Sequence, residues 1–427
     1  MGAKSKKPKI RFAGFAEDWE QRRLGDVVIF LPHNTFSRAD LSENGEILNI
    51  HYGDVLVKFG EVLDVSDEQI PFVSKTKKIN NIDKLKLKNG DIIFADAAED
   101  ETVGKCTEVY AIFDKSVISG LHTIPCRPKI NFAAAYLGYF FNSQCYHTQL
   151  LPLMQGIKVL SLSKTALLQT DIFYPSKQSE QAKIGTFFRH LDHLITLHQR
   201  KCGRLKNIKK AMLERMFPKK GADVPEVRFA GFTGAWEQRK LGELMLFQNG
   251  FNSGSDAYGS GIALISVMDI LNNNCITYSI ILGKAQVKPA DAMRYSVEYG
   301  DVLFQRSSEN VEDAGRSNVY LDSSHSAIFG GFVIRGKKKS DYNPIFIKYL
   351  LDTFAIRIQI TSKAQGAQHI NVTQETLQDV QLYMPSLTEQ KQVGTFFRHL
   401  DHLITLHQRK LTLLQNIKKA CLANMFA

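Results

Sequence analysis

The feature that most constrains this chain is an internal repeat. The 17 residues Gly185–Lys201, with the sequence GTFFRHLDHLITLHQRK, recur without change at Gly394–Lys410. The match resumes with NIKKA at Asn207–Ala211 and at Asn416–Ala420. Unrelated amphipathic helices share a pattern of apolar positions, but they do not share identical side chains. The repeat therefore indicates that the chain consists of two copies of one plan.

A shorter repeat opens each copy. RFAGF stands at Arg11–Phe15 and again at Arg228–Phe232, and each is followed by WEQR, beginning at Trp19 and at Trp236. These two residues are the tryptophans of the chain. Each copy is therefore ordered as a short opening box, a long divergent segment and a helical box.

The divergent segments, roughly residues 30–175 and 243–385, share only a skeleton. Glycine and apolar positions match at a constant shift of 210 residues, whereas the polar residues differ. The matched pairs are Gly90 with Gly300, Asp91 with Asp301, Phe94 with Phe304, Tyr110 with Tyr320, Gly120 with Gly330, Gly156 with Gly366, and Pro175 with Pro385. This pattern predicts one fold that carries two different surfaces.

Each helical box predicts one long helix with a single apolar face, because apolar residues recur every three or four positions. About 35 residues without an internal proline correspond to ~50 Å of helix. A helix of this length cannot bury its apolar face against itself, so we expect the two boxes to pair as an antiparallel coiled coil with pseudo-two-fold symmetry. The predicted seams are Ile184, Phe188, Leu191, Ile195, His198, Cys202, Leu205, Ile208, Met212 and Met216 in the first helix, and Val393, Phe397, Leu400, Ile404, His407, Leu411, Leu414, Ile417, Cys421 and Met425 in the second.

The divergent segments predict mixed α/β (α+β) domains. Short apolar runs bounded by glycine indicate strands, and longer runs rich in aromatic residues indicate short helices. We predict strands at Asp91–Phe94, Asp301–Phe304, Ile118–Ile124 and Ile328–Ile334, and helices at Phe132–Phe141 and Pro344–Phe354. The expected division is 1–175 for the first box and domain, 176–217 for the central helix, 218–227 for a linker, 228–385 for the second box and domain, and 386–427 for the C-terminal helix.

Composition narrows the classes of partner. The 427 residues carry a net charge of +11, which favours a polyanion such as nucleic acid, because each phosphate that is neutralised releases a counterion. A lysine-rich protein without such a partner is the alternative. The six cysteines do not follow zinc-ligand spacing and are typical of reduced thiols in the cytoplasm. No run of 18 apolar residues and no signal peptide is found, so we expect a cytoplasmic protein that does not cross a membrane.

Recognisable catalytic motifs are missing from the sequence. Asn343-Pro344-Ile345-Phe346 approaches the motif of AdoMet-dependent methyltransferases, but it lacks the second proline and is better explained as a capped helix N-terminus. The pairs His190/His193 and His399/His402 have a spacing that can hold a metal, yet no third ligand stands at a fixed distance. We therefore predict no catalytic residue and no metal site, and we expect that the chain is not an enzyme.

The repeated boxes resemble a known family. The opening box at Arg11–Asp26 and Arg228–Glu243 is similar to the conserved region that begins each half of type I restriction–modification specificity subunits. The later segment with E-Q-x-x-I/V-G-x-F-F, within Pro175–Ile195 and Pro385–Ile404, resembles the second conserved region of that family. The resemblance extends over both halves in the expected order.

The resemblance implies a function and a set of partners. Each divergent segment would be a target recognition domain that reads one half of a bipartite, asymmetric site in double-stranded DNA. The helices would form the spacer and, with the other conserved regions, dock two methyltransferase subunits, after which motor-nuclease subunits join. The chain itself would hold no cofactor, because AdoMet, ATP and magnesium belong to these partner subunits.

The candidate contact residues follow from side-chain chemistry, with a solvated loop as the alternative for each. Arginine can bind guanine with two hydrogen bonds, asparagine and glutamine can bind adenine, and lysine clusters bind phosphates. The DNA-contact candidates are Lys75, Lys77, Lys78, Lys105, Gln155, Lys158, Arg306, Ser307, Ser308, Asn310, Arg316, Gln365, Gln368 and His369, beside the acidic Asp96, Glu99 and Asp100. The candidates for coiled-coil and partner contacts are Phe188, Leu191, Ile195, Leu205, Phe397, Leu400, Ile404 and Leu414.

Two other functions remain open at this stage. The first is a coiled-coil scaffold with two ligand domains and no role on DNA, which predicts no salt-dependent DNA binding. The second is a self-contained methyltransferase or nuclease, which the missing motifs argue against.

Overall fold

The computed structural model describes residues 7–66, 69–79, 81–252, 254–271, 275–364, 366 and 369–427. The chain divides into two compact units. Unit 1 comprises Met1–Gln199 and Arg409–Ala427, and unit 2 comprises Arg200–Gln408. Each unit therefore contains one divergent segment, the start of the long helix that follows it, and the end of the other long helix.

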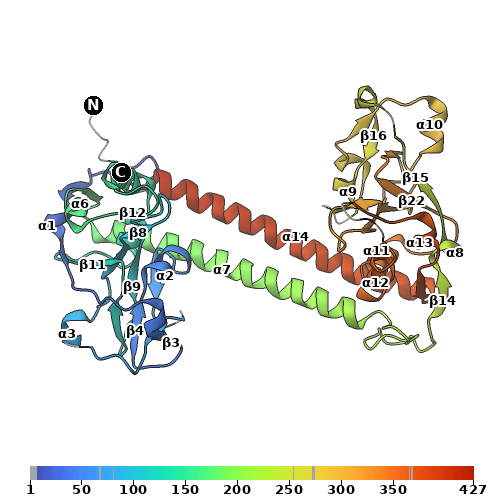
Figure 1. Ribbon diagram of the computed structural model, residues 1–427. Coiled ribbons are helices and arrows are strands. Elements are labelled where there is room, and N and C mark those ends of the chain that lie inside the picture. Colours follow the sequence, from blue (N-terminus) through green and yellow to red (C-terminus); the bar gives the residue numbers. More distant parts are fainter. Residues whose placement is uncertain are drawn as a thin grey trace. The chain divides into compact units, whose positions relative to one another are not determined.

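The two long helices are the predicted ones. Helix α7 extends over Gln178–Arg215 and helix α14 over Leu387–Asn424, each 38 residues long (Figure 1). In unit 1, Phe188 of α7 stacks on Phe426, and Asp192, one turn later, pairs with Lys418 of α14. Later residues of α7 therefore contact earlier residues of α14. The helices pack antiparallel, as the sequence predicted.

Unit 2 repeats this packing with the two helices exchanged. Phe397 of α14 stacks on Phe217, which follows α7, and Asp401 pairs with Lys209 at 2.7 Å. A tyrosine completes each set, because Tyr139 donates to Asp192 and Tyr349 donates to Asp401, both at 2.7 Å. The end of each long helix is therefore held in a globular core through the same three kinds of contact.

The predicted seam is wrong at one position in each helix. Ile208 and Ile417 are 40% and 38% exposed, whereas the neighbouring Lys209 and Lys418 turn inward. At this point the helix packs on a globular unit that presents a carboxylate and a tyrosine ring, to which an ammonium group binds and an isoleucine does not. Of the candidates for coiled-coil and partner contacts, Phe188, Leu191, Phe397, Leu400 and Ile404 are buried, while Ile195, Leu205 and Leu414 are partly buried.

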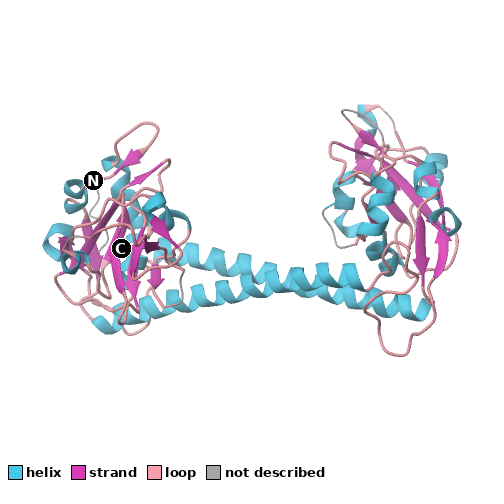
Figure 2. Cartoon of the chain, turned by 60° about the horizontal axis from the view of Figure 1, so that its bottom comes forward, coloured by secondary structure: helices cyan, strands magenta, loops and turns pink. Residues whose placement is uncertain are grey.

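Unit 1 is a mixed α/β fold, with strands lined by short helices (Figure 2). One sheet has the order β2-β11-β7-β9-β5 and a second has the order β10-β4-β6-β3, with β1-β13 and β12-β8 as separate pairs. The strands are β1 (Glu20–Arg23), β2 (Val28–Phe30), β3 (Leu41–Ser42), β4 (Ile47–Ile50), β5 (Val62–Asp64), β6 (Phe72–Val73), β7 (Ile92–Ala95), β8 (Ala97–Ala98), β9 (Cys106–Tyr110), β10 (Ser116–Ser119), β11 (Thr123–Pro128), β12 (Leu160–Ser161) and β13 (Asp171–Tyr174). The helices before α7 are α1 (Leu24–Val27), α2 (Tyr52–Val57), α3 (Ile82–Leu85), α4 (Tyr136–Phe141), α5 (Gln144–Leu150) and α6 (Lys164–Leu168).

Unit 2 has the same plan. Its sheets have the orders β15-β22-β18-β20 and β17-β16-β21, with the pairs β14-β24 and β19-β23. The strands are β14 (Glu237–Lys240), β15 (Met245–Asn249), β16 (Tyr258–Ile265), β17 (Lys284–Ala285), β18 (Val302–Gln305), β19 (Ser307–Ser308), β20 (Ser317–Val319), β21 (Ile328–Phe329), β22 (Val333–Lys338), β23 (Ile370–Asn371) and β24 (Gln381–Met384). The helices before α14 are α8 (Leu241–Leu244), α9 (Val267–Leu271), α10 (Pro289–Arg294), α11 (Pro344–Leu351), α12 (Phe354–Thr361) and α13 (Gln374–Gln378).

Several predicted element bounds need correction. The runs at 118–124 and 328–334 are each the end of one strand, a turn and the start of the next, because Gly120 and Gly330 bend the chain between them. The helix predicted from Phe132 begins at Tyr136, and the one predicted to reach Phe354 ends at Leu351, with a separate helix α12 beginning at Phe354. The constant shift of 210 residues also fails locally.

Tyr110 and Tyr320 are not equivalent. In the β7–β9 pair Ile92 lies opposite Glu108, and in the β18–β20 pair Val302 lies opposite Val319. Glu108 thus matches Val319, so unit 2 has one additional residue in the preceding loop. Gly120 and Gly330 regain the original register, because their amides donate to Ile50 and Ile265 in matching strands.

The opening box is joined to the start of each long helix by a buried ion pair. Arg11 donates two hydrogen bonds to Glu180, at 2.6 and 2.8 Å, and Arg228 donates two to Glu389, at 2.6 and 2.7 Å. Both glutamates lie in the first turn of their helix, with side chains only 1% exposed. The two sequence boxes are therefore one structural element.

We expect Arg11→Ala to lower the free energy of unfolding of unit 1 by about 3 kcal/mol, because Glu180 would remain buried without its cation. Chemical unfolding followed by Trp19 fluorescence, in a Trp236→Phe background, measures this change. Arg22→Ala is the matched control, since the Arg22–Glu20 pair lies on the surface and its loss should leave the curve unchanged. Equal effects of the two substitutions would contradict the assignment.

A second expectation concerns the residues that follow each long helix. Phe426 is buried against Trp19, Tyr136 and Phe188, so Phe426→Ala should destabilise unit 1 by about 3 kcal/mol through the cavity that it leaves. The same Trp19 readout measures it. Phe217→Ala serves as the counterpart: it should lower the unfolding midpoint that Trp236 reports in a Trp19→Phe background, and leave in place the midpoint that Trp19 reports in the Trp236→Phe background.

Candidate nucleic-acid interface

In each unit the structure brings together two loops that lie far apart in the sequence. The segment after β7 forms β8, which pairs with β12 beyond the loop of Gly156. In unit 2 the segment after β18 forms β19, which pairs with β23 beyond the loop of Gly366. The two loops proposed separately from sequence therefore form one surface in each unit.

One residue in each unit connects this surface to a third segment. The amide of Asp96 donates to the carbonyl of His122, and its own carbonyl accepts from Leu162, at 3.0 and 2.9 Å. In unit 2 the amide of Arg306 donates to Phe332, and its carbonyl accepts from Val372, at 2.8 and 2.9 Å. We call the residues joined in this way the junction: Asp96, His122 and Leu162 in unit 1, and Arg306, Phe332 and Val372 in unit 2.

Glycine is required at the turn of the second loop. Gly156 has φ +119°, and a Cβ there would lie 2.0 Å from the carbonyl oxygen of Val159. The hairpin is closed by two hydrogen bonds between Gln155 and Ser161, at 3.0 and 2.8 Å. Gly366 has φ +134° and the equivalent close approach, 1.9 Å from the carbonyl oxygen of His369. A glycine with positive φ that lies against the carbonyl three residues later therefore stands at the matching position of both units.

The candidate residues of unit 1 differ in how exposed their side chains are. Gln155 and Lys158 are exposed on the hairpin, next to Ile157, which is fully exposed. Lys105 is held inside: its Nζ donates to the carbonyls of Leu56 and Phe59, and burial lowers its pKa. This ammonium group therefore fixes the end of α2.

The lysine cluster follows β6, on the other sheet of unit 1. Lys77 pairs with Asp40 at 2.6 Å, and this contact, together with hydrogen bonds from Ser37, lowers the pKa of Asp40 to about 2. Lys75 and Lys78 are exposed. Lys77 is exposed as well but is engaged by Asp40, so a phosphate can most readily reach Lys75 and Lys78.

The unit 2 candidates gather on β19 and the loop after it. Arg306 is exposed, with one weak hydrogen bond to the carbonyl of Gly331 at 3.3 Å. Ser308 is buried and accepts from the amide of Asn310, whereas Arg316 pairs with Asp313 at 3.0 Å. The remaining candidates are Ser307, half-buried in β19, and His369, exposed before β23, while Gln365 and Gln368 lie outside the described residues.

Comparisons with known proteins fit this repeated architecture. A family model described as the type I restriction modification DNA specificity domain matches residues 16–207 and again 234–416. The chain belongs to this specificity family. The two matched ranges correspond to the two copies found in the sequence, and the family is the one that the repeated boxes resemble.

Relatives match over most of their length. The putative type I restriction enzyme MjaX specificity subunit of Methanocaldococcus jannaschii is 21% identical over 96% of this chain and 93% of its own. The StySPI specificity subunit of Salmonella potsdam is 21% identical over 80% and 75%. Among solved structures, the type I S subunit of M. genitalium matches with a TM-score of 0.60 at 12% identity over 99% of both chains. That likeness shows the fold.

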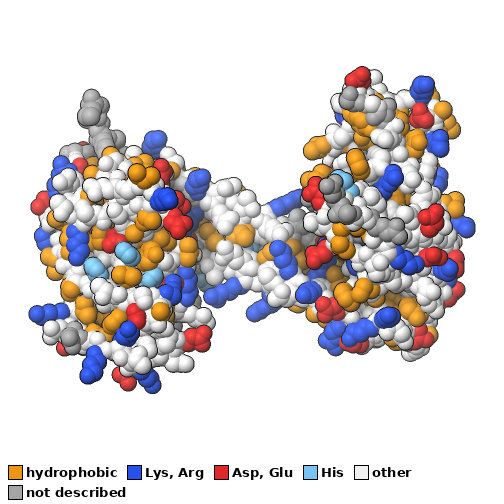
Figure 3. All heavy atoms as spheres, viewed as in Figure 1, with side chains coloured by type: hydrophobic (Ala, Val, Ile, Leu, Met, Phe, Trp, Pro, Cys, Tyr) orange, Lys and Arg blue, Asp and Glu red, His pale blue; other side chains and the backbone are white. Residues whose placement is uncertain are grey.

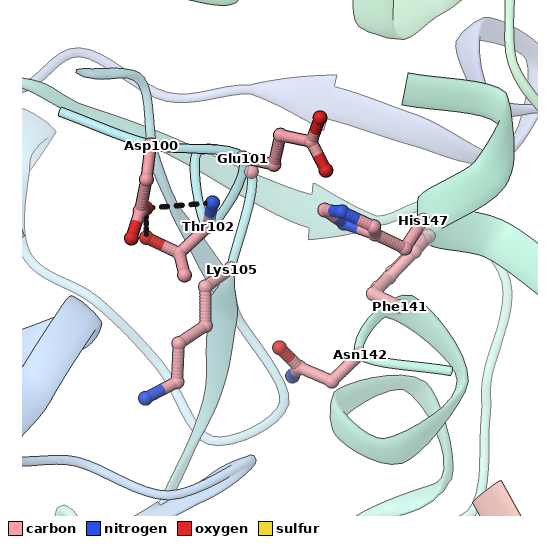
Figure 4. A pocket seen from close by; sticks show the side chains of 8 residues that line it. Asp100, Glu101, Thr102, Lys105, Phe141, Asn142 and His147 are labelled. Atoms are coloured by element: carbon pink, nitrogen blue, oxygen red, sulfur yellow. Dashed lines mark hydrogen bonds between the residues drawn. The ribbon is translucent and has the colours of Figure 1, made fainter. Parts of the chain in front are cut away.

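A pocket beside the first loop of this specificity protein does not suit a phosphate. It has a volume of about 550 Å³ and is lined by Asp100, Glu101, Phe141 and His147 among others (Figure 4). Hydrogen bonds from Thr102 lower the pKa of Asp100, so this carboxylate stays charged. Lys105 also lines the pocket, but its ammonium group is bound to the carbonyls of Leu56 and Phe59, so the carboxylates of Asp100 and Glu101 repel the DNA backbone.

Sequence reasoning missed a group of rings in unit 1. Figure 3 shows histidine side chains among hydrophobic ones on the face of unit 1 that is turned to the viewer. His51 lies 4.7 Å from Tyr52, and Tyr52 lies 5.2 Å from His122, measured between ring centroids. One signal could have found them, since His122 and Phe332 each stand two residues after the matched Gly120 and Gly330.

Among the residues that the structure describes, no group of three or more His, Cys, Asp or Glu side chains is placed to hold a metal ion. None of the helices in this part of the chain is both long and apolar enough to cross a membrane.

We expect Gly156→Ala to open the first hairpin without unfolding unit 1, because the clash is confined to an exposed turn. Hydrogen–deuterium exchange should show faster exchange of the Ser161 amide, which donates to Gln155 in the native turn. The melting temperature should change little. Gly203→Ala, on an open helix surface, is the control: it should leave the exchange of the Ser161 amide as it is and raise the melting temperature slightly, because alanine favours the helix.

Proposed function

We propose that this specificity protein reads a bipartite, asymmetric site in double-stranded DNA, with one half-site for each unit. The observation that supports this most is the junction. The same backbone hydrogen bonds recur in both units, yet they present Asp96 and His122 in one and Arg306 and Phe332 in the other. Two units that recognise different DNA sequences require a common backbone arrangement with different exposed side chains.

Binding and reading would use different residues. The net charge of +11 and exposed lysines such as Lys75 and Lys78 provide sequence-independent attraction to phosphates. Exposed junction and hairpin residues such as Arg306 and Gln155 provide hydrogen bonds to base edges. The affinity for DNA is therefore expected to fall as the salt concentration rises, whereas the preferred DNA sequence stays the same.

We also propose that the long helices dock two methyltransferase subunits, which motor-nuclease subunits then join. Exposed apolar side chains recur along both helices, which favours further helices packing against them. They are Leu194, Leu197 and Ile208 on α7, and Leu403, Leu406, Leu413 and Ile417 on α14. A structural relative with a TM-score of 0.51 and 17% identity belongs to a study of complex assembly in a type I R-M system. In this proposal AdoMet, ATP and magnesium are bound by the partner subunits, and this chain is not catalytic.

The test is genome-wide methylation sequencing of a naive host that expresses this chain with its cognate methyltransferase subunit, compared with each subunit alone. We expect one bipartite motif with a constant gap, modified only when both subunits are present. Both half-sites are then read directly from the modified positions.

Two results would reject the proposal. Modification by the methyltransferase subunit alone would show that this chain does not choose the site. A complex that forms but modifies no bipartite motif would favour a scaffold with two ligand domains. Salt-dependent binding to duplex DNA by the complex, beyond that of the methyltransferase subunit alone, separates that scaffold from a reader, because a scaffold adds none.

A further inference from the structure

Beside the junction of unit 1, four side chains from three distant segments form a continuous group. His51 and Tyr52 stand at the start of α2, His122 stands in the turn between β10 and β11, and Asp96 follows β7. Tyr52 packs between the two imidazoles, and the Nδ1 of His122 lies 3.2 Å from a carboxylate oxygen of Asp96. The side chains of His122 and Asp96 are 50% and 25% exposed, so both can reach a ligand.

The backbone at His122 has a conformation that few residues adopt. His122 has φ +53°, in the left-handed region, which histidine occupies more often than most residues other than glycine but still uncommonly. Residues held in this way gather at functional sites, where the surrounding structure fixes the side chain in one direction. Here the amide of Asp96 holds the carbonyl of His122, and the imidazole lies against the Asp96 carboxylate.

Unit 2 offers different chemistry at each matching position. Ile50 and Ile265 accept from the matched glycines Gly120 and Gly330, so the residues after them correspond. The positions of His51, Tyr52, Asp96 and His122 in unit 1 are taken by Ser266, Val267, Arg306 and Phe332 in unit 2. Phe332 is 70% exposed, so its ring is free to contact a ligand.

We propose that this group, and not only the hairpin loops, reads the bases, so that it makes the two half-sites different. The assignment rests on the proposed function. In unit 1, Asp96 and His122 present acceptors for the amino groups of cytosine or adenine. In unit 2, Arg306 presents donors for guanine, and Phe332 provides an apolar contact for a thymine methyl group.

The experiment uses the complex of the full chain with its methyltransferase subunit. The variants Tyr52→Val and His122→Asn alter unit 1, and asparagine tolerates the positive φ. Phe332→Ala alters unit 2 by shortening an exposed side chain. Methylation sequencing gives the motif, and rates on duplexes with single-base changes in each half-site give the preference. Melting temperature and complex formation are measured for every variant.

Unit 2 supplies a matched control. His325 lies 3.4 Å from Asp322 and stacks on Tyr278 at 4.8 Å, a trio of the same residue types. It lies between β20 and β21, at the other end of these strands from the Phe332 turn. His325→Asn therefore makes the same chemical change away from the junction.

We expect Tyr52→Val and His122→Asn to lower the methylation rate of the native first half-site roughly tenfold or more, and to relax the preference at one base position. The second half-site and the gap stay the same. Phe332→Ala lowers the rate and relaxes the preference at the second half-site and leaves the first half-site as it is. His325→Asn changes neither half-site. If the folded unit 1 variants and Phe332→Ala all keep the native motif and rate, the assignment is wrong although the proposed function stands. A wild-type complex without a bipartite motif overturns the proposed function and this assignment with it.

Discussion

The bidentate pair between an arginine of the opening box and a glutamate in the first turn of the long helix is the interaction on which the fold depends. Glu180 and Glu389 are buried, and each lies in the first turn of its helix, where the helix dipole favours an anion. Because guanidinium and carboxylate meet through two parallel hydrogen bonds, the direction of the helix is fixed relative to its unit. Every contact further along α7 and α14 starts from this angle.

The junction shows how one backbone arrangement can carry different side chains. Its hydrogen bonds involve only backbone atoms, so they form equally well around Asp96 and around Arg306. A change of exposed side chain alters what the surface binds, while the cores below it remain the same. Under the proposed function, stability and recognition would therefore be carried by different atoms of the same residues, which would allow one fold to serve two DNA sequences.

The sequence was sufficient for the parts that repeat or follow a period. The long helices, the Gly-Asp strands and the positive-φ turn at Gly156 all leave local signals. It was not sufficient for contacts between distant segments. Lys209 and Lys418 interrupt an apolar pattern because a carboxylate and a tyrosine face them, and nothing near them in the sequence reports this. The ring group of Tyr52 and its neighbours was missed for the same reason.

The mismatch of Tyr110 and Tyr320 shows where the two copies are free to diverge. Eleven residues separate Phe94 from its partner Cys106, and twelve separate Phe304 from Ser317. The additional residue lies in the loop that carries the contact candidates, where both ends are held by strand pairing. A change of length there redirects side chains without moving the strands. The later loop is shorter by one residue, which restores the register before the turn of Gly120 and Gly330. In this region the two copies thus differ in length only in loops whose ends are held by paired strands.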